Sequence, residues 1–352
     1  MAAFDFDFDL LCELTETHGA PGYEDDVRDI VRRELDGEVD RLRSDAMGNV
    51  VGTIDGSTDA DYSVLVAAHM DEIGFMVRHV DKYGFLEIDA LGSWDPHVLR
   101  AERVNVRTED GDLPGVIGSP PPHTGGDEDA DERTVHDVRV DVGLSVEEVK
   151  NRVSVGDLVT MSQRTEPLGE CVSGKAIDNR VSVFALLELA KRIENPDVTV
   201  HFAATVQEEV GLRGAEALGV DVESDLAIAL DTTVANDLTD YEKWDYVTRL
   251  GEGTAIKLKD SSVITNPKVH RRIRSVAEAE DIDHQFEVLP TGGTDTGSLQ
   301  RSHGALPVGA ISIPTRYLHT PTEVAHGDDI TGAIDLTTAF IESEDGQHDY
   351  TL

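Results

Sequence analysis

Five short segments of this sequence carry histidine and carboxylate side chains of the kinds that bind divalent metal ions. They are His69-Met70-Asp71, Asp178-Asn179, Glu208-Glu209, Asp231 and His319. Histidine combined with carboxylate suits Zn²⁺ or Co²⁺ better than Mg²⁺ or Ca²⁺, which prefer ligand shells made only of oxygen. A carboxylate that bridges two ions about 3.5–4 Å apart forms the two-metal centre found in several classes of hydrolase.

The spacing within two of these segments suggests that neighbouring side chains have different roles. His69 and Asp71 lie two residues apart at the end of an apolar run, so on a strand they share one face. Asp71 could then approach the imidazole and determine its tautomer, as carboxylates do behind metal-bound histidine. Glu208 and Glu209 are adjacent, so their side chains diverge on an extended chain. One of them can bind metal while the other faces the substrate.

Each candidate also has a structural explanation when it is taken alone. Asp178 could cap the helix that follows it. Glu208 and Glu209 could be two solvated charges in an acidic protein, and His319 could be a hydrogen-bonded core histidine. All five segments lie at the end of a predicted strand or at the start of a predicted helix, and this shared placement favours one metal site over five separate structural roles.

Those positions follow from the predicted elements. Apolar runs typical of buried strands precede four of the candidates, at 63–68, 198–206, 225–230 and 308–313. Apolar residues at helical spacing predict helices at 27–35, from about 178, at 267–279 and at 329–343. Strands that alternate with helices indicate a mostly parallel, mixed α/β sheet flanked by helices. Open sheets of this kind bind ligands beyond the carboxyl ends of their strands.

Between residues 73 and 163 the pattern changes to short alternating segments separated by Gly, Pro and Asp. This pattern predicts a small β-barrel or sandwich. Residues 120–122 are three prolines and residues 127–132 form an acidic run, which we interpret as a solvated loop. We therefore expect an α/β domain formed by residues 1–72 and 164–352, with residues 73–163 inserted as a second domain.

Composition excludes some classes of function. The 352 residues include 70 acidic and 30 basic side chains, which gives a net charge of -40. This balance argues against binding to nucleic acid or to an anionic membrane surface. A uniformly acidic surface is best tolerated at molar salt, where the Debye length is about 3 Å. We interpret it as halophilic; the alternative is an acidic mesophilic enzyme.

We expect a cytoplasmic protein. No run of 18 apolar residues is present, and the first residues lack the basic region of a signal peptide. Cys12 and Cys171 form neither a disulfide framework nor a zinc-ribbon pattern.

The same segments resemble the tetrahedral (TET) aminopeptidases of peptidase family M42, of the halophilic archaeal type. The resemblance covers nearly the whole chain. It rests on AHMDEIGFMV (68–77), GKAIDNR (174–180), QEEVGLRGA (207–215), ALDTT (229–233), GGTDTGSLQ (292–300) and ISIPTRYLHTPTEV (311–324), with ELTETHGAPGYEDDVR (13–28), GSWDPHVL (92–99) and GVIGSPPPH (115–123) in support. The acidic run at 127–132 is a loop elaboration beyond the usual pattern.

The resemblance implies a role for each candidate. Asp178 would bridge two divalent ions, Zn or Co, with His69 and Asp231 completing one site and Glu209 and His319 the other. Glu208 would be the general base that takes a proton from the attacking water and passes it to the leaving amine, and Asp71 would orient His69.

The resemblance also implies a zinc-exopeptidase type of fold and a dodecamer of tetrahedral shape built from dimers. The inserted PDZ-like domain would serve dimerisation and act as a lid. Peptides with a free N-terminus, such as those released by larger proteases, would be the substrates.

Several alternatives remain open at this point. They are another two-metal amidohydrolase such as a carboxypeptidase or aminoacylase, a glycosidase that uses a carboxylate pair, and a catalytically silent scaffold. Asp295 could favour substrates with basic side chains, or it could be a structural turn residue.

Overall fold

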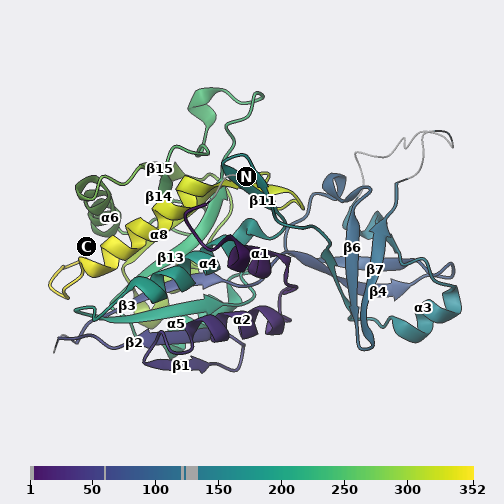
Figure 1. The fold of residues 1–352 in the computed structure, drawn as a ribbon, viewed down its shortest axis with the longest axis horizontal. Coiled ribbons are helices and arrows are strands. Elements are labelled where there is room, and N and C mark those ends of the chain that lie inside the picture. Colours follow the sequence, from purple (N-terminus) through teal and green to yellow (C-terminus); the bar gives the residue numbers. More distant parts are fainter. Residues whose placement is uncertain (1–3, 59–60, 120–122, 124–133) are drawn as a thin grey trace.

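The computed structural model describes residues 4–58, 61–119, 123 and 134–352. They form a larger α/β part and a smaller β-barrel that lies to one side of it (Figure 1). The predicted solvated loop and the three prolines lie outside the described residues.

The α/β part is built on one mixed sheet with the strand order β1-β2-β12-β3-β13-β16-β17-β11-β10, and β14 and β15 extend it from β16. Its centre is parallel, because β12, β3, β13 and β16 run in one direction. The flanking pairings are mostly antiparallel, so the predicted mostly parallel sheet is correct only for the centre. The strands are β1 (Arg41–Ser44), β2 (Val50–Ile54), β3 (Ser63–His69), β10 (Glu166–Leu168), β11 (Cys171–Gly174), β12 (Thr199–Thr205), β13 (Leu226–Val234), β14 (Thr254–Lys259), β15 (His284–Val288), β16 (Val308–Arg316) and β17 (Glu323–His326).

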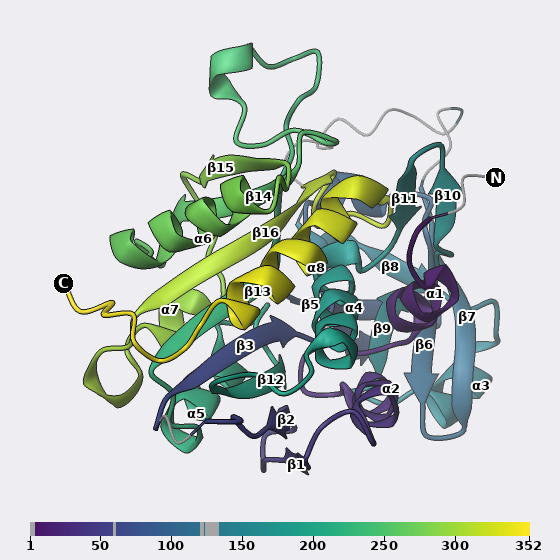
Figure 2. The ribbon, with the colours of Figure 1, turned by 60° about the vertical axis from the view of Figure 1, so that its left-hand side comes forward.

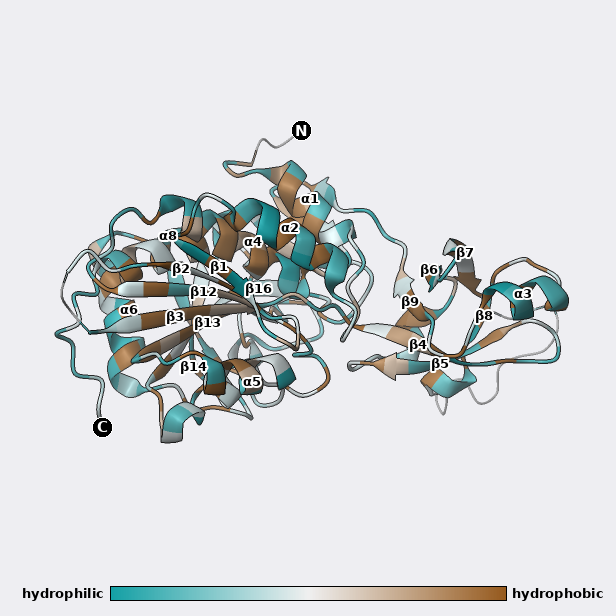
Figure 3. Ribbon diagram, turned by 90° about the horizontal axis from the view of Figure 1, so that it is seen from below, coloured by the Kyte–Doolittle hydropathy of each residue, from teal (hydrophilic) through white to brown (hydrophobic). Residues whose placement is uncertain are grey.

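Helices cover both faces of this sheet. The face that carries α1, α2, α4, α6 and α8 holds the main apolar core, and Figure 2 shows α4 and α8 side by side on it. The short helices α5 and α7 pack on the opposite face over a smaller core. Figure 3 shows the apolar strands between the two layers and the polar helix surfaces outside. The helices are α1 (Phe8–Glu16), α2 (Asp25–Leu35), α4 (Ile177–Arg192), α5 (Arg213–Asp221), α6 (Pro267–Ala279), α7 (Thr296–Leu299) and α8 (Gly327–Glu342).

Local sequence explains the main elements. The central strands β3 and β13 are almost continuously apolar because helices cover both of their faces. Helix α4 is buried nearly all round, between the sheet and its neighbouring helices. Helix α6 begins where Asn266 accepts hydrogen bonds from the next turn and Pro267 occupies the first position.

The smaller part is a closed six-stranded barrel with the order β4-β5-β8-β7-β6-β9. It has its own apolar core. The alternating segments of the sequence predict five of its strands, at 74–80, 85–88, 103–107, 138–142 and 158–161. They do not predict β7, because Pro114 and Gly115 interrupt the alternating pattern. Its elements are β4 (Gly74–Val80), β5 (Leu86–Leu91), β6 (Arg103–Thr108), β7 (Gly111–Ile117), β8 (Arg139–Asp141), α3 (Val146–Arg152) and β9 (Leu158–Met161).

Among the described residues, none of the helices is both long and apolar enough to cross a bilayer.

Candidate metal centre

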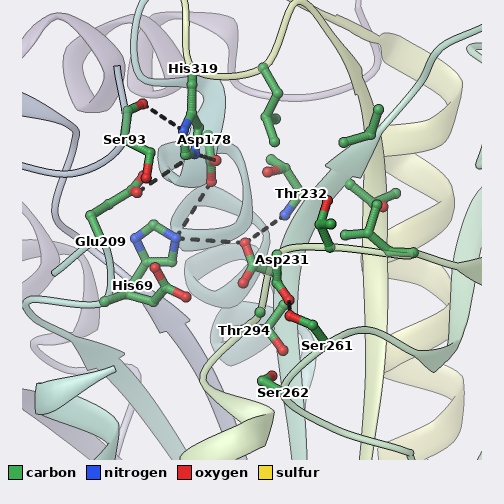
Figure 4. A pocket seen from close by; sticks show the side chains of 18 of the residues that line it. His69, Ser93, Asp178, Glu209, Asp231, Thr232, Ser261, Ser262, Thr294 and His319 are labelled. Atoms are coloured by element: carbon green, nitrogen blue, oxygen red, sulfur yellow. Dashed lines mark hydrogen bonds and ion pairs between the residues drawn. The ribbon is translucent and has the colours of Figure 1, made fainter. Parts of the chain in front are cut away.

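All five predicted segments meet at the carboxyl ends of the central parallel strands (Figure 4). These strands end on the same edge of the sheet, so side chains that are distant in sequence converge there. His69 is the last residue of β3, Asp231 lies near the end of β13, Glu208 and Glu209 follow β12, His319 follows β16, and Asp178 lies in the first turn of α4.

Two groups of side chains share one aspartate. In the first group, Nε2 of His69 lies 3.5 Å from Oδ1 of Asp178 and 3.6 Å from Oδ1 of Asp231. In the second, Nε2 of His319 lies 3.4 Å from Oδ2 of Asp178 and 3.6 Å from Oε2 of Glu209. Each carboxylate oxygen of Asp178 therefore faces a different group, as a bridging ligand would. Asp178 does not cap α4 through its side chain, so the structural explanation for it is not observed.

Hydrogen bonds orient both imidazoles toward the carboxylates. Nδ1 of His69 lies 3.2 Å from the backbone oxygen of Asp71, and Nδ1 of His319 lies 3.0 Å from the backbone oxygen of Ser93. A carbonyl oxygen only accepts, so each Nδ1 must donate. In the neutral imidazole the lone pair is then on Nε2, which faces the carboxylates. Metal-ligating histidines have this arrangement.

The unpaired atoms and the charges of the site fit cations. Oδ1 of Asp178 and Oε1 of Glu209 are buried without a hydrogen-bond partner. Burial, followed by the charge of Asp178, raises the pKa of Glu209 to about 8. Burial would lower the pKa of His319, but Asp178 and Glu209 raise it to about 10. Burial would also lower the pKa of His69, but the neighbouring carboxylates of Asp178, Asp231 and Asp71 raise it well above its usual value. Each Nε2 thus faces carboxylates that only a proton or another cation can neutralise.

Glu208 lines the same pocket but belongs to neither group. Its backbone N–H donates to Oδ1 of Asp71 at 3.0 Å, and that of Glu209 donates to Oδ2 at 3.1 Å. The sequence predicted that Asp71 would approach His69, and its carboxylate does lie 3.5 Å from Nδ1. The sequence did not predict that the same carboxylate holds the loop of both glutamates.

Sequence reasoning missed two further residues that contact the centre. The backbone of Ser93 binds His319, and the buried carboxylate of Glu323 binds the backbone amides of Asp178 and His319. Both lie inside motifs that carry the resemblance, GSWDPHVL and ISIPTRYLHTPTEV, but neither position has a metal-ligand spacing of its own.

The pocket has a volume of about 410 Å³ and extends from the two groups along a wall of small and apolar residues. Beyond the predicted site residues this wall includes Ser261, Ser262, Leu289, Thr291 and Thr294. Asp295 does not line it; its carboxylate is buried and accepts a hydrogen bond from Thr205. The position of Asp295 therefore favours the structural alternative over a role in selecting basic side chains.

Comparison with known proteins gives a consistent family. The model of the M42 glutamyl aminopeptidase family matches residues 48–336. The lysyl aminopeptidase of Pyrococcus furiosus is 32% identical over 96% of this chain and 97% of its own length.

Solved structures agree with the sequence match. An aminopeptidase from the archaeon Desulfurococcus kamchatkensis has a TM-score of 0.92 and 38% identity, covering 96% of this chain and 94% of that one. The TET1 peptidase of Pyrococcus horikoshii, described as able to assemble into a tetrahedron or a large octahedral shell, has a TM-score of 0.86 and 32% identity. That match covers 96% of this chain and 99% of the other.

Proposed function

This chain belongs to the M42 glutamyl aminopeptidase family, and we propose that it removes single residues from the N-termini of peptides with the help of two divalent metal ions. One observation carries the metal dependence. Oδ1 of Asp178 lies beside His69 of the first group, Oδ2 lies beside His319 of the second, and Asp178 is a member of both groups.

In this proposal the two ions are Zn²⁺ or Co²⁺, because each group combines one imidazole with two carboxylates. When bound, the ions supply a Lewis acid for the scissile carbonyl and make water more acidic at neutral pH. The residues that would hold them are His69, Asp178, Asp231, Glu209 and His319. Asp71 keeps the imidazole of His69 and the loop of the two glutamates in place.

Glu208 is the general base in this mechanism. It lies in the pocket wall beside both groups without belonging to either, so its carboxylate is available to substrate. Burial raises the pKa of Glu208 well above its usual value, and a carboxylate with a raised pKa is a better proton acceptor than an ordinary one near neutral pH. It takes the proton from the attacking water and gives it to the leaving amine. The surplus of carboxylates also provides an anionic partner for the free α-amine of a peptide.

The side-chain preference does not follow from the family, since its relatives include enzymes named for glutamyl and for lysyl residues. Among the described residues of the pocket wall, Lys257 is the only charged one apart from the site residues, and its ammonium group is paired with Glu287 and Asp260. The other described residues of the wall are serines, threonines, glycines and the aliphatic residues leucine and valine. We therefore propose a preference for uncharged first residues such as leucine or methionine.

We further propose that the chain assembles as a homo-oligomer, as the TET1 peptidase of P. horikoshii does. The barrel is the candidate dimerisation element, and residues 73–163 are the proposed inserted domain. Light scattering should give a mass about twelve times that of one chain if the assembly is the tetrahedral dodecamer. A monomer at working concentration would contradict this part.

The central test is hydrolysis of a panel of aminoacyl chromogenic amides in high salt, with matched N-acetylated substrates, before and after chelation. The proposal expects release only from free amines, loss of activity on chelation and recovery with Zn²⁺ or Co²⁺. Activity confined to blocked substrates would indicate an aminoacylase or an endopeptidase. Cleavage of a cellulose fragment that survives chelation would indicate a glycosidase. No hydrolysis with metals bound would favour a scaffold.

A further inference from the structure

Glu323 is a buried carboxylate that joins two of the metal-binding segments. It is 2% exposed and begins β17, where it pairs in register with Gly174 of β11. Its Oε2 accepts the backbone N–H of Asp178 at 2.9 Å, and its Oε1 accepts that of His319 at 2.8 Å. Both oxygens are therefore used by backbone amides of candidate ligands, from segments 145 residues and four residues away in the chain.

The segments that Glu323 joins have backbone conformations that side chains disfavour. His319 has φ of 59°, and Ala176, two residues before Asp178, has φ of 53°. A non-glycine residue in the left-handed region is strained and persists only where surrounding contacts hold it. The two bonds from Glu323 are such contacts, because they hold the backbone amides of Asp178 and His319.

Within the described part of the chain, no lysine or arginine forms an ion pair with Glu323. Among the described contacts, its two carboxylate oxygens accept from the backbone amides of Asp178 and His319. The geometry of Glu323 is therefore directed at the metal centre and not at a separate ion pair.

We propose, on the basis of the proposed function, that Glu323 is a positioning residue for the second metal group. It holds the main chain of Asp178 and of His319 in fixed relation, and so brings two of the three members of the group Asp178, Glu209 and His319 into place. In the group His69, Asp178 and Asp231 it contacts one member only. Loss of Glu323 therefore weakens the second site more than the first.

The test compares Co²⁺ binding to metal-free wild type and to Glu323→Gln, measured by titration calorimetry and by the visible absorption of bound Co²⁺. The substitution preserves size but turns one oxygen into an amide group, which cannot accept from a backbone N–H. We expect the second ion to bind about tenfold more weakly, since a change of this size follows from one lost buried hydrogen bond. The first ion should lose less affinity than the second, and excess Co²⁺ should restore hydrolysis of an aminoacyl amide.

Asp329→Asn is the matched control. Asp329 is also fully buried and also accepts two backbone N–H groups, from Gly251 at 2.8 Å and Gly253 at 2.9 Å, but it belongs to neither metal group. The Asp329→Asn variant should bind both ions as wild type does. If this control lost as much affinity for the second ion as Glu323→Gln does, the effect would be a general destabilisation and the inference would be overturned.

Glu323→Asp separates geometry from charge and serves if Glu323→Gln does not fold. It keeps the charge but is one methylene too short to reach both amides, so the second site should again be weakened. Wild-type affinity for the second ion in a folded variant would overturn the positioning role. If wild type itself bound no Co²⁺, the proposed function would fail too. If wild type and both variants bound the second ion with equal affinity, only this inference would be removed.

Discussion

His319 donates its Nδ1–H to the backbone oxygen of Ser93 across 3.0 Å, although 226 positions separate the two residues. Ser93 follows β5 of the barrel, and the next residue, Trp94, donates to the carbonyl of Gly74 and stacks on Phe75 with ring centroids 4.8 Å apart. The barrel therefore orients an imidazole of the metal centre in the α/β part. The inserted segment contributes to the site even though it provides no member of either group.

The shared aspartate leads to the first prediction. Asp178→Ala should lower the metal content at both sites, because Asp178 is the one member common to the two groups. His319→Ala should remove one ion and leave the other. Metal per chain can be measured by mass spectrometry after equilibrium dialysis, with His136→Ala as an exposed control from the barrel. Two ions retained in Asp178→Ala would contradict the bridging role.

The second prediction concerns the base. Glu208→Gln should lower kcat by a factor of about 10²–10⁴, the usual contribution of a general base, and leave the metal content unchanged. Glu216→Gln, an exposed glutamate on α5, is the control and should behave as wild type. Wild-type turnover in Glu208→Gln would refute the assignment.

Asp71→Asn tests the carboxylate behind the loop. An amide group cannot accept both backbone N–H groups of Glu208 and Glu209, so the glutamates should lose their alignment. We expect activity or metal affinity to fall about 10–100-fold, as for other residues that orient metal ligands. Asp81→Asn removes a carboxylate that accepts Tyr83 and Phe85 amides in an exposed turn, and it should have no such effect. Equal losses in the two variants would count against a specific role for Asp71.

Stability should fall on acidification through His201. Burial, with the charges of Arg41 and Arg43, lowers the pKa of this histidine to about 4 from 6.5. The unfolded chain therefore binds more protons between these two values, so the free energy of unfolding decreases as the pH falls from about 6.5 to about 4.

Thermal unfolding at fixed salt should show that the free energy of unfolding of His201→Gln falls less steeply over this pH range than that of wild type. The difference should be on the order of 2 kcal/mol after allowance for partial solvent contact. His136→Gln, an exposed histidine, should follow the wild-type curve. Parallel curves for wild type and His201→Gln would exclude this contribution.

Salt should stabilise the protein if its surface is halophilic. The 70 acidic side chains repel one another over a Debye length that grows from about 3 Å at 1 M salt to about 10 Å at 0.1 M. The unfolding temperature should therefore drop on dilution of KCl over this range, and sucrose, which does not screen charge, should not replace the salt. Equal stability in dilute buffer would support the acidic mesophilic alternative.

The sequence alone identified the candidate metal residues and the elements that carry them. His69 and His319 could be found because residue type and position after an apolar strand are local properties of the chain. The same is true of α6, whose predicted bounds match the structure. In contrast, β7 and α5 were missed, since Pro114, Gly115, Gly214 and Gly219 weaken their local patterns.

Only the tertiary structure decided which groups hold the candidate ligands in place. The contacts of Ser93 with His319, of Asp71 with two backbone amides, and of Glu323 with Asp178 join segments far apart in the chain. Hydrophobic periodicity records which face of an element is buried, but it does not record which distant element packs there. The antiparallel flanks of the sheet and the hydrogen bonds behind the metal centre therefore depended on folding of the whole chain.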